Sequence, residues 1–418
     1  MMDIQLSHRR FKISKEQLFK DIYRAYKDAR KHKRGRLYQL EFEYALEENL
    51  IALCDELIAA TYKPLPSSCF IIHEPKMREI FAANFKDRIV HHLFYNYTHL
   101  LFERTFVHDS YSCIKKRGTH YGISRLRHHI RSVSAGYSKP CYILKVDVKG
   151  YFMSIDRSKL LDICRMTFAK MKNRNSGMSG LKWCEIMDFS FIDYLLETIV
   201  CSDPVENCIV KGREEEWNLL PPEKSLFQSA YGCGLPIGNL SSQLFSNIYL
   251  NVLDNYIKRE LKCKHYGRYV DDAYIVSNDR KILKSIIPSI DKFLKSRLGL
   301  SLHHNKVRIY DAYQGVEFLG AYIKPHRVYI SSRSLKRIKH NMANLHRMGV
   351  QRMQASLNSC LGVLSHYDCF CLRRVMLGNL GNLNSVGRFN SDWLVFRPFK
   401  SCQRNIVCDS KNSSSNLF

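Results

Sequence analysis

The sequence lacks the segments that carry a chain into or across a membrane. It has no run of 18 or more apolar residues, and it does not begin with a charged stretch followed by an apolar one, as a secretory leader would. We therefore expect a cytoplasmic protein with no membrane partner. We also find no internal repeat.

Closely spaced cysteine pairs of the CxxC type are absent, although the chain has fifteen cysteines. Without an export signal, scattered cysteines are expected to be buried thiols. One cluster, Cys360, His366, Cys369 and Cys371, has the residue types that bind zinc. Its spacing fits no common zinc finger and it lies in a helix-like region, so we favour buried thiols there as well.

Acidic residues are scarce: 39 Asp and Glu stand against 65 Lys and Arg, which gives a net charge of +26. Such an excess favours a polyanionic partner. The imbalance is steepest at two places. Residues 1–40 hold twelve Lys or Arg and four Asp or Glu, and residues 318–367 hold eight Lys or Arg and no acidic residue.

Both basic segments have the pattern of helices. The first contains a basic run at 30–36, with Arg34 and Arg36 near its end. In the second, Leu335, Ile338 and Met342 repeat at helical spacing, and the surrounding positions are basic: Arg333, Lys336, Arg337 and Lys339. Solvated helix faces would explain these residues, but contact with a phosphate backbone explains them equally well. These six residues are therefore candidate nucleic-acid contacts.

What the sequence does contain is a pair of adjacent carboxylates between two strand-like runs. Asp271 and Asp272 end the tetrapeptide Tyr-Val-Asp-Asp at 269–272, and the flanking alternation predicts a hairpin with the acids at its tip. Asp147 follows another strand-like run, residues 142–146. An Asp-Asp pair alone is typical of a solvated turn. Desolvated neighbouring carboxylates repel each other and need a cation, and three of them suit the two ions that clamp an in-line phosphoryl transfer.

These boxes, in this order, resemble those of the reverse transcriptases. A third box, Gly-Leu-Pro-Ile-Gly-Asn-Leu-Ser-Ser-Gln, lies at 234–243, between Asp147 and the hairpin. Further segments resemble the outlying blocks of bacterial members; they are 76–80, 85–88, 102–106, 109–112, 116–120, 304–306 and 318–320. The resemblance covers roughly residues 60–325. It implies an α+β right-hand polymerase, with fingers, a palm built on an antiparallel sheet and a helical thumb.

The resemblance also implies a site. Asp147 and Asp271 would hold two Mg²⁺ ions, with Mn²⁺ as the alternative, Asp272 would complete the acidic cluster, and the Val148 carbonyl would be a further ligand. Lys76, Arg78 and Lys306 would approach the triphosphate. The alternative interpretation of each is a solvated surface charge. Phe152 would stack under the deoxyribose. The alternative interpretation is an aromatic residue that only packs in the core. Ile237, Gly238 and Gln243 would contact the nucleotide.

The box at 234–243 narrows the choice within the family. Group II intron enzymes carry Gln where this chain has Ile237, and Pro where it has Gln243, whereas enzymes of diversity-generating retroelements share the pattern seen here. Residues 222–227 and 41–57 resemble that group too. In bacteria and phages, such an enzyme copies a template RNA into cDNA from dNTPs, misincorporates opposite adenines and works with a small accessory protein.

Other readings stay open at this point. The chain could be a group II intron, retron or phage-defence reverse transcriptase. It could also be an RNA-binding, maturase-like protein whose polymerase activity is secondary, although a pure binder gains nothing from three carboxylates that face phosphates.

We expect four segments. They are a basic helical extension (1–60), fingers and palm (61–325, with an insertion at about 165–232), a helical basic thumb (326–400) and a polar, disordered tail (401–418). Surface elaboration of the palm is the simplest explanation of the insertion, and its role stays open. A helix is expected from Gly238, with Leu240, Leu244 and Ile248 on its apolar face and a polar start, Ser241 to Asn247, turned to template and nucleotide.

Overall fold

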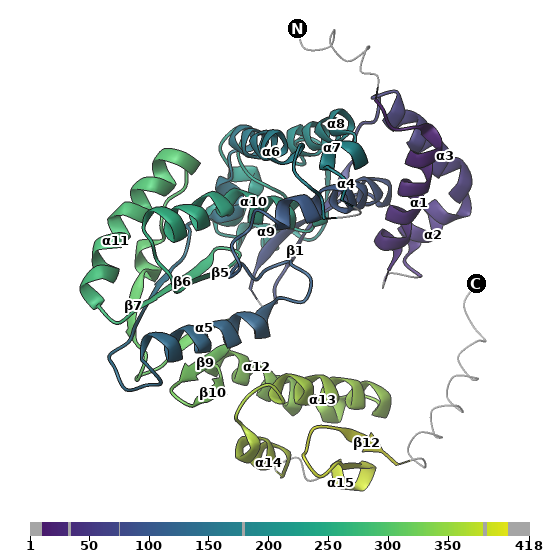
Figure 1. Ribbon diagram of the computed structural model, residues 1–418. Coiled ribbons are helices and arrows are strands. Elements are labelled where there is room, and N and C mark those ends of the chain that lie inside the picture. Colours follow the sequence, from purple (N-terminus) through teal and green to yellow (C-terminus); the bar gives the residue numbers. More distant parts are fainter. Residues whose placement is uncertain (1–10, 32–34, 75, 178–179, 379–382, 400–418) are drawn as a thin grey trace, which may run out of the picture. The chain divides into compact units, whose positions relative to one another are not determined.

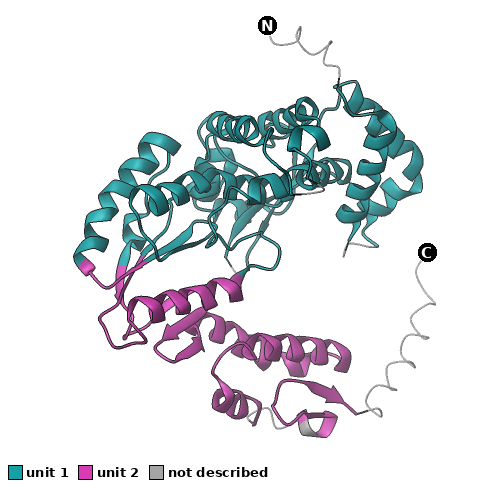
Figure 2. Cartoon of the chain, in the orientation of Figure 1, with its two compact units in different colours: residues 1–118, 145–275, 281–308 teal, residues 119–144, 276–280, 309–418 magenta. Residues whose placement is uncertain are grey.

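The computed structural model describes residues 11–31, 35–74, 76–177, 180–378 and 383–399. These residues form two compact units (Figure 2). The first unit is made of residues 1–118, 145–275 and 281–308, and the second of residues 119–144, 276–280 and 309–418. Two of the predictions, Arg34 and the tail at 401–418, lie outside the described residues.

The first described residues of unit 1 form three helices, as their pattern predicts: α1 (Lys15–Arg30), α2 (Leu37–Tyr44) and α3 (Leu46–Ile58) (Figure 1). The Ser14 hydroxyl caps α1 by accepting a hydrogen bond from the Gln17 backbone N–H. Leu18, Ile22 and Ala25, spaced by four and three, are buried on the face of α1 that packs against α4 (Phe85–Glu103).

A three-stranded sheet of unit 1 has the order β2-β1-β4, with β1 (Ser67–Ile72), β2 (Arg78–Ala82) and β4 (Cys208–Val210). β1 and β2 are antiparallel, with Phe70 opposite Ile80, whereas β4 pairs parallel to β1. Because β4 comes from the segment predicted as an insertion, that segment completes this sheet.

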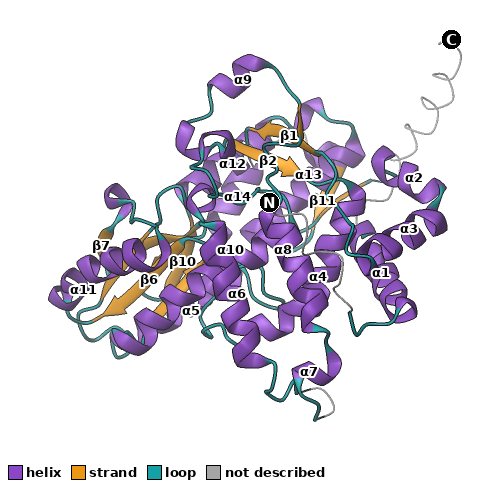
Figure 3. Cartoon of the chain, turned by 90° about the horizontal axis from the view of Figure 1, so that it is seen from above, coloured by secondary structure: helices purple, strands orange, loops and turns teal. Residues whose placement is uncertain are grey.

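The rest of the insertion is mostly helical. Besides the end of α6 (Arg157–Met171) it holds α7 (Trp183–Ile186), α8 (Phe189–Cys201), α9 (Glu214–Asn218) and the 3₁₀ turns η2 (Pro222–Lys224) and η3 (Leu226–Gln228). Helix α8 buries Phe191, Leu195 and Leu196 and packs against α4 and α6, and α10 (Leu240–Asn255) packs against the same two helices (Figure 3). The insertion therefore contributes to the core of unit 1. It is more than an elaboration of the palm surface.

The sheet that carries the acidic residues has the order β5-β6-β3-β7. Its strands are β3 (Tyr142–Val146), β5 (Tyr266–Tyr269), β6 (Asp272–Ser277) and β7 (Arg308–Asp311). β3 and the hairpin β5–β6 are the strands predicted from the sequence. Helix α10 ends in a π-turn, Tyr256–Glu260, and α11 (Arg280–Phe293) follows β6.

Unit 2 contains α5 (Thr119–Val133), which packs on a small antiparallel sheet of β8 (Val316–Phe318), β9 (Ala321–Lys324) and β10 (Arg327–Ile330). The helices that follow are α12 (Ser332–Ala343), α13 (Val350–Leu364), α14 (Phe370–Gly378) and α15 (Leu383–Val386). They share a core that includes Leu357, Leu361 and Phe396. The sequence did not predict the hairpin of β11 (Gly387–Phe389) and β12 (Phe396–Pro398), which joins this core through Phe396.

Candidate active site

Three carboxylates occupy the ends of neighbouring strands in unit 1. Tyr269 pairs with Asp272 across the β5–β6 hairpin, so Val270 and Asp271 form its two-residue turn. Asp147 comes directly after β3, the strand beside β6. The side chains of Asp147, Asp271 and Asp272 are all half-buried, so each keeps a path to solvent.

The acidic residues are in electrostatic contact. Burial, followed by the charge of Asp147, raises the pKa of Asp271 to about 6. Burial also raises the pKa of Asp272, although Lys145 opposes the shift. The Lys145 ammonium lies 3.3 Å from Asp272, and the Lys306 ammonium lies 2.5 Å from an oxygen of Asp147. The two lysines thus partly neutralise the charges of Asp147 and Asp272. At Asp271, burial and the neighbouring carboxylates dominate.

The donor set fits a hard divalent cation, because it consists of carboxylate and carbonyl oxygens. The Val148 carbonyl adds to it. Val148 faces Leu302 in an antiparallel bridge whose hydrogen bonds run from Lys149 N–H to Ser301 and from His303 N–H to Asp147. In that pattern the carbonyl of Val148 points away from Leu302.

Within the described part of the chain, no three His, Cys, Asp or Glu side chains are gathered as closely as a metal site requires. Asp147 and Asp272 are instead engaged by lysines. In the cysteine cluster, Cys360 and Cys369 are buried thiols, whereas Cys371 is exposed.

The turn that carries Asp271 is strained. Val270 has a φ of +57°, a left-handed conformation that β-branched residues avoid and that costs about 1–3 kcal/mol. Arg268 holds it there by donating from Nη1 to the Val270 carbonyl at 2.7 Å, and the Val270 N–H donates to the Ser112 hydroxyl at 3.2 Å. Both backbone groups of the strained residue are therefore fixed.

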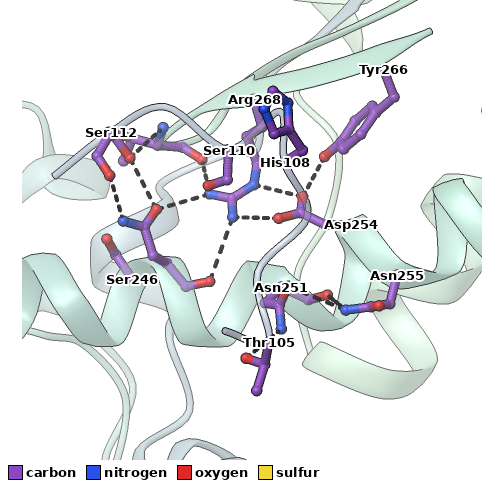
Figure 4. A network of polar contacts seen from close by, with 12 residues as sticks. Thr105, His108, Ser110, Ser112, Ser246, Asn251, Asp254, Asn255, Tyr266 and Arg268 are labelled. Carbon is purple, nitrogen blue, oxygen red and sulfur yellow. Dashed lines mark hydrogen bonds and ion pairs between the residues drawn. The ribbon is translucent and has the colours of Figure 1, made fainter. Parts of the chain in front are cut away.

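Arg268 is itself held by a buried network (Figure 4). Its Nε and Nη2 donate to the two oxygens of Asp254 at 2.7 and 2.6 Å, and the Tyr266 hydroxyl donates to the same carboxylate. Asn247, also on α10, accepts from Arg268 and exchanges hydrogen bonds with Ser112. Arg268 is 1% exposed and Asp254 is fully buried. Their two hydrogen bonds form a bidentate pair, which fixes the orientation of the guanidinium.

Sequence reasoning missed this network, which we call the turn clamp: Ser112, Asn247, Asp254, Tyr266 and Arg268. One signal was present. Arg268 interrupts an otherwise uncharged strand, and a charge in a buried strand needs a partner. The partner lies on another element, which no local pattern shows.

The residues expected to bind the nucleotide occupy different surroundings. Phe152 and Ile237 are half-buried and pack against one apolar cluster. Gly238 has a φ of +133°, and a Cβ atom there would lie 2.7 Å from the Phe81 carbonyl, so only glycine suits this loop. Lys76, Arg78 and Gln243 are exposed. Lys306, expected near a triphosphate, binds Asp147 in this structure.

The expected polar start of α10 is wrong in one respect. Gln243 is exposed, but Ser241, Ser242, Ser246 and Asn247 are buried. Ser241 hydrogen-bonds His91 at 2.7 Å, and the Ser246 hydroxyl donates to the Gln243 carbonyl. These side chains stabilise the interior, because their partners lie on α4, on the 109–112 segment or on the helix itself.

Of the candidate nucleic-acid contacts, Arg36 is exposed at the start of α2. The exposed positions of α12 carry the other four described ones: Arg333, Lys336, Arg337 and Lys339. On the same helix, Ile338 and Met342 are buried, which agrees with the predicted amphipathic pattern.

Comparison with known proteins decides the family. The sequence profile of the family described as reverse transcriptase (RNA-dependent DNA polymerase) matches residues 72–323, more than half of the chain. The chain belongs to the reverse transcriptase family. With the mixture of helices and antiparallel strands described above, this confirms the predicted fold class, the α+β right-hand polymerase.

Individual relatives are distant. Protein YkfC of Escherichia coli (strain K12) is 23% identical over 309 residues, which cover 66% of this chain and 71% of that protein. A COX1/OXI3 intron 2 protein of Saccharomyces cerevisiae is 28% identical over 181 residues, or 40% of this chain and 19% of that protein.

Among solved structures, a truncated apo telomerase from Candida tropicalis aligns with 64% of this chain and 55% of its own, with 15% identity and a TM-score of 0.43. The chain thus spans a little over half the length of that telomerase. In the part of the chain that the structure describes, no helix has the length and apolarity needed to cross a membrane.

Proposed function

We propose that this reverse transcriptase is an RNA-directed DNA polymerase that makes cDNA by two-metal nucleotidyl transfer. The observation that carries the proposal is the placement of Asp147 beside a hairpin whose strained turn presents Asp271 and Asp272, within a chain of this family. A binding module would have no use for half-buried carboxylates that repel one another, because they weaken contact with phosphates.

In this proposal, the carboxylates of Asp147 and Asp271 and the carbonyl of Val148 hold two Mg²⁺ ions, and Asp272 completes the cluster. When bound, such ions make the primer hydroxyl nucleophilic and neutralise the triphosphate. The protein's own part is to hold and orient these oxygens. Lys145 and Lys306 supply the compensating charge in the structure seen here, and a released Lys306 ammonium is free to meet the triphosphate.

The remaining contacts follow from exposure and position. Exposed Lys76 and Arg78, at the start of β2, would bind the incoming phosphates. Phe152 would lie under the deoxyribose, and Ile237, Gly238 and Gln243 would border the base pair. Template RNA, primer or cDNA and dNTPs are the partners of this reaction, and Arg34, Arg36 and the basic residues of α12 would bind backbone phosphates.

We further propose the error-prone role of a diversity-generating retroelement, encoded by a bacterium or phage and acting in the cytoplasm with a small accessory protein. Its support is Ile237, whose apolar side chain can contact a nascent base pair only by shape. A Gln at this position would add a hydrogen bond or two, about 1–3 kcal/mol of discrimination. The second candidate is an intron-type enzyme, which the likeness to the intron 2 protein favours.

The error spectrum separates these two roles. We expect the unmodified enzyme, with its cognate RNA and accessory protein, to misincorporate opposite template adenines more than opposite other bases. Ile237→Gln should reduce those errors by roughly 5- to 150-fold, the equivalent of the added hydrogen bonds. Sequencing of cDNA measures both. Equal, low error rates at all four template bases would remove the mutagenic role and leave the polymerase.

A further inference from the structure

The segment from Val205 to Phe227, here called the buttress, lies within the insertion and is largely exposed, but it buries Ser225 and Leu226 beside the expected nucleotide contacts. Leu226 belongs to an apolar cluster whose buried members are Cys69, Phe81, Met153 and Leu226. Phe152 and Ile237, the expected sugar and base contacts, pack against it, and so do Val205, Cys208 and Trp217 of the buttress. The apolar support of the pocket is therefore shared between the palm and the buttress.

A buried carboxylate ties the buttress to the strand that carries Arg78. Glu79, only 1% exposed, accepts hydrogen bonds from the Ser225 hydroxyl and the Leu226 N–H, each at 2.7 Å. Residues alternate in β2, so Arg78 is exposed while Glu79 points inward. β2 is an edge strand that pairs only with β1 in the described sheet, and the Glu79 side chain ties it to the buttress in addition.

The buttress also meets the loop that precedes Ile237. Gly234 has a φ of +97°, and a Cβ atom there would lie 2.3 Å from the Leu226 side chain, so loop and buttress are packed without a gap. Backbone hydrogen bonds continue the connection: Leu235 N–H donates to the Phe152 carbonyl, and Phe81 N–H donates to the Ile237 carbonyl, both at 2.8 Å. Leu226 therefore touches the one loop that joins both expected nucleotide contacts.

The opposite end of the buttress is anchored in the sheet. Its strand β4 pairs parallel with β1, Ser67 N–H donates to the Asn207 carbonyl, and Lys211 N–H donates to the Cys69 carbonyl. The Phe227 ring lies 5.7 Å from Phe81 and 5.9 Å from Trp217, measured between ring centroids. With both ends held, the buttress can transmit a fixed position to Glu79 and to the 234–237 loop.

We propose that the buttress is a positioning element of the nucleotide pocket, in which Ser225 and Leu226 set the places of Arg78, Phe152 and Ile237 and so tune nucleotide binding and selectivity. Neither residue touches substrate; both act through Glu79 and the apolar cluster. The proposal rests on the proposed polymerase function and gives the insertion a part in it.

Steady-state extension of a primed RNA template tests this proposal, with KM for dNTP, kcat and misincorporation measured for each variant. Ser225→Ala removes one hydrogen bond to Glu79, and Leu226→Ala opens a cavity beside Phe152 and Ile237. We expect KM to rise about 5- to 10-fold and misincorporation to increase, while kcat changes less than about twofold, since the carboxylates are untouched. Ser225→Thr keeps the hydroxyl and Leu226→Met keeps the side-chain volume, so both variants should retain the wild-type KM.

The matched control is Leu195→Ala, which makes the same cavity at a fully buried leucine of α8, also within the insertion. It should lower thermal stability as Leu226→Ala does but leave KM for dNTP unchanged. If Leu226→Ala does not fold, the milder Ser225→Ala still decides the matter. An active wild-type enzyme whose Ser225→Ala and folded Leu226→Ala variants keep the KM and error rate of the Leu195→Ala control would overturn the proposal. A wild-type enzyme without extension would instead reject the polymerase function itself.

Discussion

At the scale of single residues, Arg268 links a buried charge to a strained turn. The Asp254 carboxylate fixes the guanidinium in its plane, and the remaining nitrogen reaches the carbonyl of Val270, next to Asp271. A planar fork can make these bonds at once, whereas the ammonium of a lysine cannot reproduce the geometry. The position of Asp271 therefore depends on a residue that contacts neither substrate nor metal in the proposed mechanism.

We predict that Arg268→Lys lowers primer extension by about 10- to 100-fold, because the turn is no longer held in place, and leaves RNA binding unchanged. The double variant Arg268→Met, Asp254→Leu removes both buried charges and should recover thermal stability without recovering extension. Thermal melting, RNA binding and primer extension are the three measurements. Full extension by the double variant would show that the turn clamp serves folding alone.

Helix α4 carries two titrating groups with shifted pKa values, the buried Asp87 and the half-buried His91. Burial raises the pKa of Asp87 to about 6, above its ordinary 3.8, and lowers that of His91 to about 4, below its ordinary 6.5. Between pH 4 and 6 the folded protein holds the Asp87 proton that the unfolded chain releases, so this group destabilises the fold by up to about 3 kcal/mol as pH rises. His91 has the opposite sign, since its unfolded form holds the extra proton.

The two effects offset each other in the wild type, and Asp87→Asn isolates one of them. We expect the free energy of unfolding of Asp87→Asn, relative to wild type, to increase by about 2 kcal/mol from pH 4 to pH 6. Urea unfolding at several pH values measures it, with exposed Asp162→Asn of α6 as the control. A constant difference between variant and wild type across this interval would contradict the raised pKa of Asp87.

The sequence indicated Asp147, Asp271 and Asp272 because a carboxylate at the end of an apolar run is a local pattern. It could not indicate the turn clamp, since Ser112 and Asn247 are 135 residues apart and meet only in the folded chain. For the same reason, it turned the serines of α10 toward substrate. The partner of Ser241, His91, is also distant in sequence.

At the scale of elements, periodicity was a reliable guide where one face of an element is buried. Strand β3, the β5–β6 hairpin and helix α12 agree with their predicted patterns. The role of the insertion could not be predicted, because its mixed charges and its prolines at 221 and 222 are typical of surface segments. After α8, its apolar residues are too widely spaced to form a periodic face, yet Trp217 and Leu226 pack in one cluster.

Helix α12 allows a prediction about nucleic-acid binding. Replacing Arg333, Lys336, Arg337 and Lys339 with Gln should weaken RNA binding. It should also reduce the slope of log affinity against log salt by about 0.7 for each lost contact with a single-stranded phosphate. The control removes four exposed basic charges elsewhere, by changing Lys170, Lys172, Arg174 and Lys182 to Gln. Equal losses for both variants, measured by binding titrations across a salt series, would mean that only net charge matters.

At the scale of the whole molecule, an acidic centre lies within a chain of net charge +26. The two features serve different steps in the proposed reaction. Exposed basic residues such as those of α12 would bind the polyanion, whereas the half-buried carboxylates would act on the reacting phosphate. The sequence predicted the family and the fold class from several ordered motifs. The β11–β12 hairpin was not predicted, because its short strands carry too little alternation to stand out.

The separation of binding from chemistry is the central claim, and primer extension on an RNA template with Mg²⁺, measured beside RNA affinity, tests it most directly. Asp147→Asn, Asp271→Ala and Asp272→Ala should each abolish nucleotide addition while RNA affinity stays within about twofold of wild type, because the phosphate contacts are made elsewhere. Asp162→Asn, at an exposed position, should be fully active. Undiminished extension by Asp147→Asn would contradict the assignment of the site.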